Sequence, residues 1–118
     1  MTKQLKDIFK NSKILGVDFS EDAINIAKKR FKNIEFEVNS IEKFNKKYDV
    51  SMCSNVLEHF YNPFEQLKRI FEQTSKIVVI MMPFQEQNLH EEHFYSFDYN
   101  DYKMEQDDFY LVYYKIIN

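Results

Sequence analysis

The chain has 118 residues, 44% of them hydrophobic and 30% charged, with a formal net charge of −3. This composition predicts one globular domain, 1–118, and its acidic balance argues against nucleic acid as a partner. A single cysteine, Cys53, excludes an internal disulfide and metal sites built from several thiolates. No apolar run reaches the roughly 18 residues that cross a bilayer, and no signal-peptide core is present, so we expect a cytoplasmic protein without a membrane partner.

Glycine occurs once, at Gly16, whereas average usage near 7% would give about eight. Gly16 is therefore the only residue whose backbone adopts positive φ at no steric cost. The chain as it stands excludes a glycine-rich loop that holds a phosphate or a nucleotide.

The first third of the chain predicts two helices and two strands. Apolar residues at helical spacing predict a short amphipathic helix over 3–10, and the apolar run 13–18 predicts a strand buried on both faces. Ser20 is suited to cap a second helix, whose apolar face has four residues and whose basic end complements the helix dipole. Alternation over 34–38 predicts a strand with one exposed face. The four residues of the helix face are Ala23, Ile24, Ala27 and Phe31.

The remainder predicts further alternation of strands and helices. Residues 48–54 read as a strand, and Asn62-Pro63 as the cap and first turn of a helix that ends near Thr74. The elements that follow are a strand over 76–82, a long loop over 84–107 and a final strand over 108–117. This order predicts an α/β fold with a mainly parallel sheet covered by helices on both faces.

Three segments in this order resemble the class I S-adenosylmethionine (SAM)-dependent methyltransferases, especially the small-molecule type with a Val-Leu-Glu-His motif. They are ILGVDFS at 14–20, YDVSMCSNVLEH at 48–59, and the strand ending at Pro83 with the histidine-containing loop after it. The resemblance covers about residues 3–97. It implies a Rossmann-like methyltransferase fold and transfer of a methyl group from SAM to a small-molecule acceptor.

The resemblance also implies the cofactor residues, which follow strands whose carboxyl ends bind ligands in such sheets. Asp18 would bind the ribose of SAM and Phe19 would pack on adenine. Asn39 stands where many relatives have aspartate. The adenine edge is assigned to Asn39 and Ser40, and the methionine part to Ser54 and Asn55.

Glu58 and His59 would line the methyl-transfer pocket. Histidine has an unperturbed pKa near neutrality, which makes His59 the expected base, with Glu58 orienting it or holding a substrate hydroxyl. His90, His93 and Phe94 would close the pocket as a lid. No metal enters this primary interpretation.

Each assignment has a structural alternative. Asp18 is also suited to cap the following helix, Phe19 to lie in the core, and the segment 55–59 to form a satisfied polar turn. We favour packing over the sheet for the loop aromatics, and a buried, inert thiol for Cys53.

Relatives begin with a strand and a Gly-x-Gly-x-Gly turn, and Met1 lies about two residues before the helix that follows this turn. We therefore expect an N-terminally incomplete domain that lacks the first central strand and binds SAM weakly or not at all. The open sheet edges would close on each other, or be covered by a second copy in a homodimer or by a separate chain.

Two other functions stay open. The chain could be a catalytically inactive, methyltransferase-like binding or regulatory protein. It could also be a metal-dependent RNA 2′-O-methyltransferase with Glu58, His59, His90 and His93 as ligand types, although such enzymes have a further glutamate where this chain has Asn55.

Overall fold

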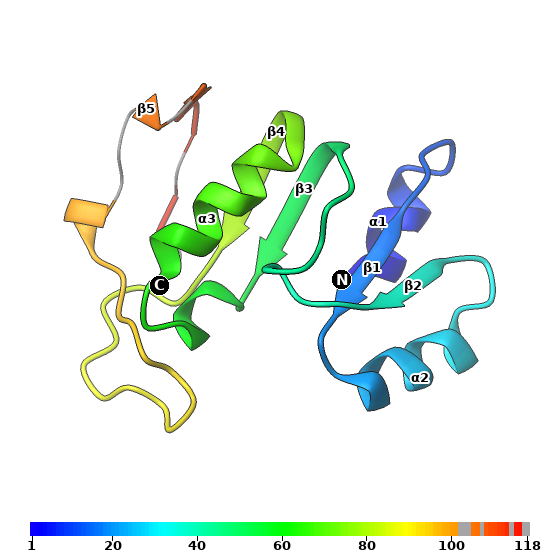
Figure 1. Cartoon of the computed structure of the whole chain (residues 1–118), viewed down its shortest axis with the longest axis horizontal. Coiled ribbons are helices and arrows are strands. Elements are labelled where there is room, and N and C mark those ends of the chain that lie inside the picture. The colour runs from blue at the N-terminus through cyan, green and yellow to red at the C-terminus, as the bar shows by residue number, and fades with distance from the viewer. Residues whose placement is uncertain (102–104, 107, 114, 117–118) are drawn as a thin grey trace. The chain divides into compact units, whose positions relative to one another are not determined.

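The computed structural model describes residues 1–101, 105–106, 108–113 and 115–116. The chain forms two compact units, Met1–Phe44 and Asn45–Asn118. Each unit contains a pair of parallel strands and at least one helix (Figure 1).

The first unit confirms the predicted order of helix, strand, helix and strand. Its strands pair in parallel, with Leu15 opposite Glu35 and Asp18 opposite Val38, so both strands end at the same edge. The elements are α1 (Thr2–Ile8), β1 (Leu15–Asp18), α2 (Glu21–Arg30) and β2 (Glu35–Val38).

Helix α2 begins where the cap predicts. The Ser20 hydroxyl oxygen accepts a 3.2 Å hydrogen bond from the backbone N–H of Ala23. Of the predicted apolar face, Ile24 is buried whereas Ala23 is exposed. Burial of β1 on both faces is wrong, because Val17 is exposed and only Gly16 is buried in that strand.

Gly16 serves close packing rather than an unusual backbone conformation. It lies opposite Phe36, and a β-carbon built on Gly16 would lie 2.6 Å from Cδ1 of that ring. Positive φ is instead adopted by Asn55, at 52°, and by Gln85, at 51°. Asparagine visits this region more readily than most residues, because its short amide bonds to nearby backbone.

The second unit is built around parallel strands β3 and β4, with Ser51 opposite Val78 and Cys53 opposite Ile80. Helix α3 begins at Pro63 after the Asn62 cap, as predicted, and ends at Glu72, so β4 starts earlier than expected. The elements are β3 (Tyr48–Ser54), η1 (Leu57–His59), α3 (Pro63–Glu72), β4 (Thr74–Met81), η2 (Tyr99–Asp101), β5 (Glu105–Gln106) and β6 (Phe109–Tyr110).

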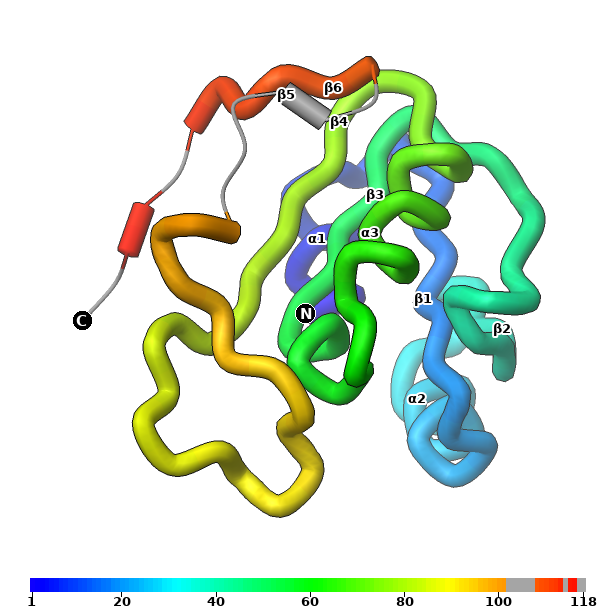
Figure 2. The backbone as a smooth tube through the Cα atoms, turned by 60° about the vertical axis from the view of Figure 1, so that its left-hand side comes forward, coloured from blue at the N-terminus to red at the C-terminus, as the bar shows by residue number. Residues whose placement is uncertain are grey.

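One face of the β3–β4 pair packs against α3 (Figure 2). At this junction the buried hydroxyl of Thr74 lies 2.6 Å from both the carbonyl oxygen of Ile70 and the hydroxyl of Ser51. Side chains on the opposite face, including Val50 and Ile77, are exposed. Within this unit, α3 therefore covers one face of the β3–β4 pair, and the other face is exposed.

The final predicted strand is largely wrong. Among the described residues of 108–117, Phe109–Tyr110 alone forms a strand, paired antiparallel with β5, and 111–113 has no regular structure. Residues 114 and 117 lie outside the described residues. Among the residues that the structure describes, no helix has the length and apolar character to span a membrane.

Candidate functional site

Asp18 and Phe19 stand at the carboxyl end of β1 in the first unit. Asp18 is exposed, and its Oδ1 accepts a 2.8 Å hydrogen bond from the backbone N–H of Ser20 in the turn before α2. The cap of α2 is Ser20, so a capping role for Asp18 is wrong. The Phe19 side chain is 81% exposed. A place in the core is therefore wrong for Phe19, and both side chains are accessible to a ligand.

Asn39 and Ser40 follow β2 at the same edge of this strand pair. The Asn39 backbone N–H donates to the carbonyl oxygen of Asp18 at 3.0 Å. The Asn39 side chain donates to Glu37 and accepts from the Ser40 N–H, both at 2.9 Å. The Asn39 amide is thus occupied locally at both ends. The Ser40 hydroxyl is buried and has no hydrogen-bond partner in the described ranges of the chain.

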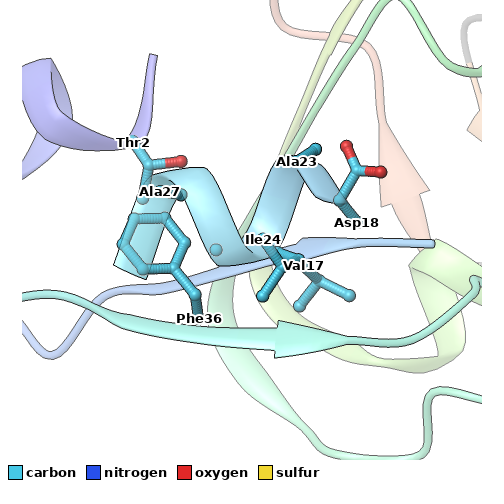
Figure 3. Close-up of a pocket in the computed structure, with 8 residues that line it drawn as sticks. Thr2, Val17, Asp18, Ala23, Ile24, Ala27 and Phe36 are labelled. Atoms are coloured by element: carbon cyan, nitrogen blue, oxygen red, sulfur yellow. The ribbon is translucent and has the colours of Figure 1, made fainter. Parts of the chain in front are cut away.

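A cavity of about 170 Å³ lies between α2 and the β1–β2 strands (Figure 3). Its walls include Ile24, Ala27 and Phe36, with Asp18 at one end. Pockets that bury a drug-sized ligand usually measure about 300–1,000 Å³. This cavity is therefore smaller than the pockets that usually bury a ligand of that size.

In the second unit, Ser54 ends β3 and Asn55 turns the chain toward η1. The backbone N–H of Asn55 donates to the carbonyl oxygen of Met81 at 2.9 Å, which extends the strand pairing by one residue. The Ser54 hydroxyl donates to Oδ1 of Asn55 at 3.3 Å. Asn55 has a left-handed backbone conformation, and the chain turns there into η1. Glu58 and His59 are residues of η1.

Glu58 is completely buried, with 0% of its surface exposed. Both of its carboxylate oxygens are buried and have no hydrogen-bond partner among the described residues. A satisfied polar turn is therefore wrong for Glu58. Buried carboxylates are normally paired, hydrogen-bonded or bound to a metal. Glu58 is therefore a candidate ligand for a cation.

His59 is held by the loop after β4 rather than by Glu58. Its Nδ1 lies 2.8 Å from the backbone carbonyl oxygen of Glu92. Because a carbonyl oxygen only accepts, Nδ1 carries the hydrogen, and in a neutral ring Nε2 then offers a lone pair. The ring of His93 meets that of His59 edge to face, with centroids 4.9 Å apart.

His93 is oriented in the same way by Glu86. Its Nδ1 lies 2.9 Å and 3.0 Å from the two carboxylate oxygens of Glu86. His90 is exposed, and its ring centroid lies 5.5 Å from that of His93. The two loop histidines predicted to lie near Glu58 and His59 therefore differ: His93 contacts His59, whereas His90 contacts His93.

The loop aromatics divide into packing and exposed residues. Phe97 is buried, and its ring and that of Tyr95 both contact Phe64 of α3, which confirms packing for these two. Phe94 is instead exposed and stacks on Tyr61, with ring centroids 4.3 Å apart. A role at the mouth of the site stays open for Phe94 alone.

Cys53 is buried near the end of β3. Burial, and secondarily the charge of Glu58, raise the pKa of its thiol to about 12. The predicted burial of this thiol is confirmed. Its lack of reactivity stays a prediction.

Sequence patterns did not indicate Glu86, Glu92 or Tyr61. Glu86 and Glu92 lie in a polar stretch without periodicity, and Glu92 acts through its backbone, which carries no sequence signal. Tyr61 lies two positions after His59. The presence of an aromatic residue so close to the Glu58-His59 motif was the only sequence feature that pointed to Tyr61 as part of the site.

A family model described as "Methyltransferase domain" matches residues 2–112 of the chain. Comparison with curated proteins gave no significant match. Comparison with solved structures gave none either.

Proposed function

The chain belongs to the methyltransferase domain family, and from that premise we propose that it transfers a methyl group from SAM to a small-molecule acceptor. The observation that carries the proposal is the exposed pair Asp18 and Phe19 at the carboxyl end of β1. Parallel α/β sheets bind their ligands at that end of the strands.

The chemistry of this pair suits an adenosine group. A carboxylate accepts two hydrogen bonds, which matches the two hydroxyls of a ribose. An exposed phenyl ring offers a stacking surface to a flat base. We assign ribose binding to Asp18 and adenine stacking to Phe19. Asn39 is a weaker assignment, because local hydrogen bonds occupy its amide.

When bound, SAM supplies an electrophilic methyl group on a sulfonium. The protein then has to orient the acceptor and take up its proton. The Nδ1 of His59 bonds to the Glu92 carbonyl oxygen, so its Nε2 offers a lone pair. We assign this lone pair as the proton acceptor. Glu58, the residue before His59, is buried, and its carboxylate does not hydrogen-bond to the His59 ring. Holding an acceptor hydroxyl, the other role expected of Glu58, would require this buried carboxylate to become accessible to the acceptor.

Isothermal titration of the whole chain with SAM and with S-adenosylhomocysteine tests the proposal. Asp18→Asn retains an oxygen for the Ser20 N–H but removes the charge and one acceptor. Asp22→Asn is a matched control, because Asp22 is an exposed acid in the first turn of α2. We expect weak SAM binding that Asp18→Asn weakens at least tenfold further (about 1.4 kcal/mol) and that Asp22→Asn leaves unchanged.

Loss of binding specific to Asp18→Asn would then justify a screen of acceptors for transfer of an isotope-labelled methyl group. Absence of binding to a folded sample, judged by circular dichroism, would refute an autonomous methyltransferase. That outcome would favour a binding or regulatory protein with the same scaffold.

A further inference from the structure

We propose that Glu58, His59 and His93 form a binding site for one divalent transition-metal ion, with Zn²⁺ as its probe. The sequence alone favours an assignment without metal, because Asn55 stands where metal-dependent relatives carry a glutamate. The fold of the second unit brings His93, one of the two loop histidines, together with Glu58 and His59.

The first support is convergence. One ligand atom from each of the three residues lies within 4.8 Å of the other two. A zinc–nitrogen bond measures about 2.0–2.1 Å, so ligand atoms of one ion lie up to about 4 Å apart. The three ligand atoms therefore lie near the spacing that one ion needs, and the two imidazole rings already meet edge to face.

The second support is the unsatisfied carboxylate of Glu58. Neither oxygen has a hydrogen-bond partner within the part of the chain that the structure describes, although the residue is completely buried. A buried carboxylate without a partner carries a large desolvation cost, which coordination of a cation offsets.

The third support is the second shell of the two histidines. The Nδ1 of His59 bonds to the carbonyl oxygen of Glu92, and the Nδ1 of His93 bonds to the carboxylate of Glu86. Metal-binding histidines typically donate their other ring N–H to a carbonyl or a carboxylate, which fixes the tautomer and the ring orientation. Both rings thus have Nε2 left to coordinate.

The loop reaches the site through backbone hydrogen bonds. The N–H groups of Phe94 and Tyr95 donate to the carbonyl oxygen of Glu58, at 2.8 Å and 3.2 Å. This attachment places His93 against η1 whether or not an ion is bound. The donors are therefore preorganised, which favours binding of an ion.

The donor set indicates the class of ion. Two imidazoles and one carboxylate suit Zn²⁺ and related first-row ions, whereas Mg²⁺ and Ca²⁺ prefer oxygen ligands. Three protein ligands leave a coordination position open, as in catalytic rather than structural zinc sites.

The catalytic role of the ion, unlike its binding, rests on the proposed methyl transfer. An acceptor hydroxyl that takes the open position would have its pKa lowered by the ion. Its O–H bond would then break and the proton would leave to solvent. The oxygen would form a bond to the methyl carbon as the S–CH₃ bond breaks, and its electron pair would stay on sulfur to give a thioether. With the ion bound, His59 is a ligand and no longer the proton acceptor, and the acceptor class is a hydroxyl-bearing small molecule.

The test is titration of the whole, tag-free chain with ZnCl₂ after treatment with a chelator, followed by Co²⁺ absorption spectroscopy. We expect one equivalent of Zn²⁺, and a Co²⁺ spectrum without thiolate charge transfer, since Cys53 is buried in β3. Glu58→Gln and His93→Gln should each weaken Zn²⁺ binding at least 100-fold. Glu86→Gln should weaken it about 10- to 100-fold through the second shell.

His90→Gln is the matched control, because His90 is a loop histidine outside the convergent set, and it should change the affinity less than threefold. Wild-type affinity in His93→Gln, or a stronger effect of His90→Gln, would overturn the site, as would absence of stoichiometric binding to a folded chain. If Glu58→Gln fails to fold, His93→Gln and Glu86→Gln decide the matter. SAM titration of the same samples is scored separately, so failure of methyl transfer and failure of the metal site are distinguishable.

Discussion

The rings of Tyr61 and Phe94 stack at a centroid distance of 4.3 Å and an interplanar angle of 21°, and both side chains are exposed. Tyr61 follows η1, and Phe94 follows His93 in the loop after β4. The stack therefore joins the two segments that carry Glu58, His59 and His93, on their solvent side.

This stack should contribute to binding of the acceptor and not to binding of SAM. Phe94→Ala removes an aromatic pair worth about 0.5–1.5 kcal/mol beyond its buried area, so we expect the KM of the acceptor to rise about 2- to 12-fold. The SAM affinity from calorimetry should stay within twofold. Tyr99→Ala, at an exposed tyrosine that contacts Phe84, is the control and should leave both values unchanged.

Gly16 should tolerate no side chain while Phe36 is present. In Gly16→Ala the new methyl group would lie 2.6 Å from the Phe36 ring, so we expect a loss of about 1–3 kcal/mol in the free energy of unfolding, measured in urea. Adding Phe36→Leu should recover part of that loss, because the two residues are cross-strand neighbours. Additive effects of the two substitutions would show that the ring is not the cause.

The buried thiol should give the protein a stability that is lost in alkali. The pKa of Cys53 rises from 9.0 to about 12 in the folded state, so the folded chain keeps its proton after the unfolded chain has lost it. The contribution is complete below about pH 9 and disappears as the pH rises toward 12. Relative to Cys53→Ala, wild-type unfolding free energy should fall by up to about 1.4 kcal/mol per pH unit between pH 9 and 11.

A thiol reagent provides a second measure of the same burial. We expect one equivalent to react promptly in denaturant and slowly in buffer at pH 8. Equal rates in the two conditions would mean that Cys53 is accessible in the folded protein.

The hydroxyl of Thr74 should stabilise the junction of α3, β3 and β4. Thr74→Val keeps the shape but removes the contacts with the Ile70 carbonyl oxygen and the Ser51 hydroxyl, and we expect a loss of about 1–3 kcal/mol on thermal or urea unfolding. Ser75→Ala, at the neighbouring exposed position, should cost less than about 0.5 kcal/mol. A smaller effect at Thr74 than at Ser75 would contradict this assignment.

Local signals determined most of the secondary structure. The Ser20 and Asn62 caps each placed a helix start correctly, because capping is a contact between residues three positions apart. The strand over 48–54 was also predicted with its observed bounds. The segment 108–117 failed, since its apolar run is equally suited to a strand and to an irregular segment, and only pairing with another strand distinguishes them.

The sequence by itself also identified the candidate residues: Asp18 and Phe19 after one strand, Glu58 and His59 after another, and His93 in the loop. Only the tertiary structure decided which of them meet. His93 joins Glu58 and His59 while His90 does not, because the N–H of Phe94 bonds to the carbonyl oxygen of Glu58. Every residue carries such a carbonyl group, so no side-chain pattern can show which one the loop will find.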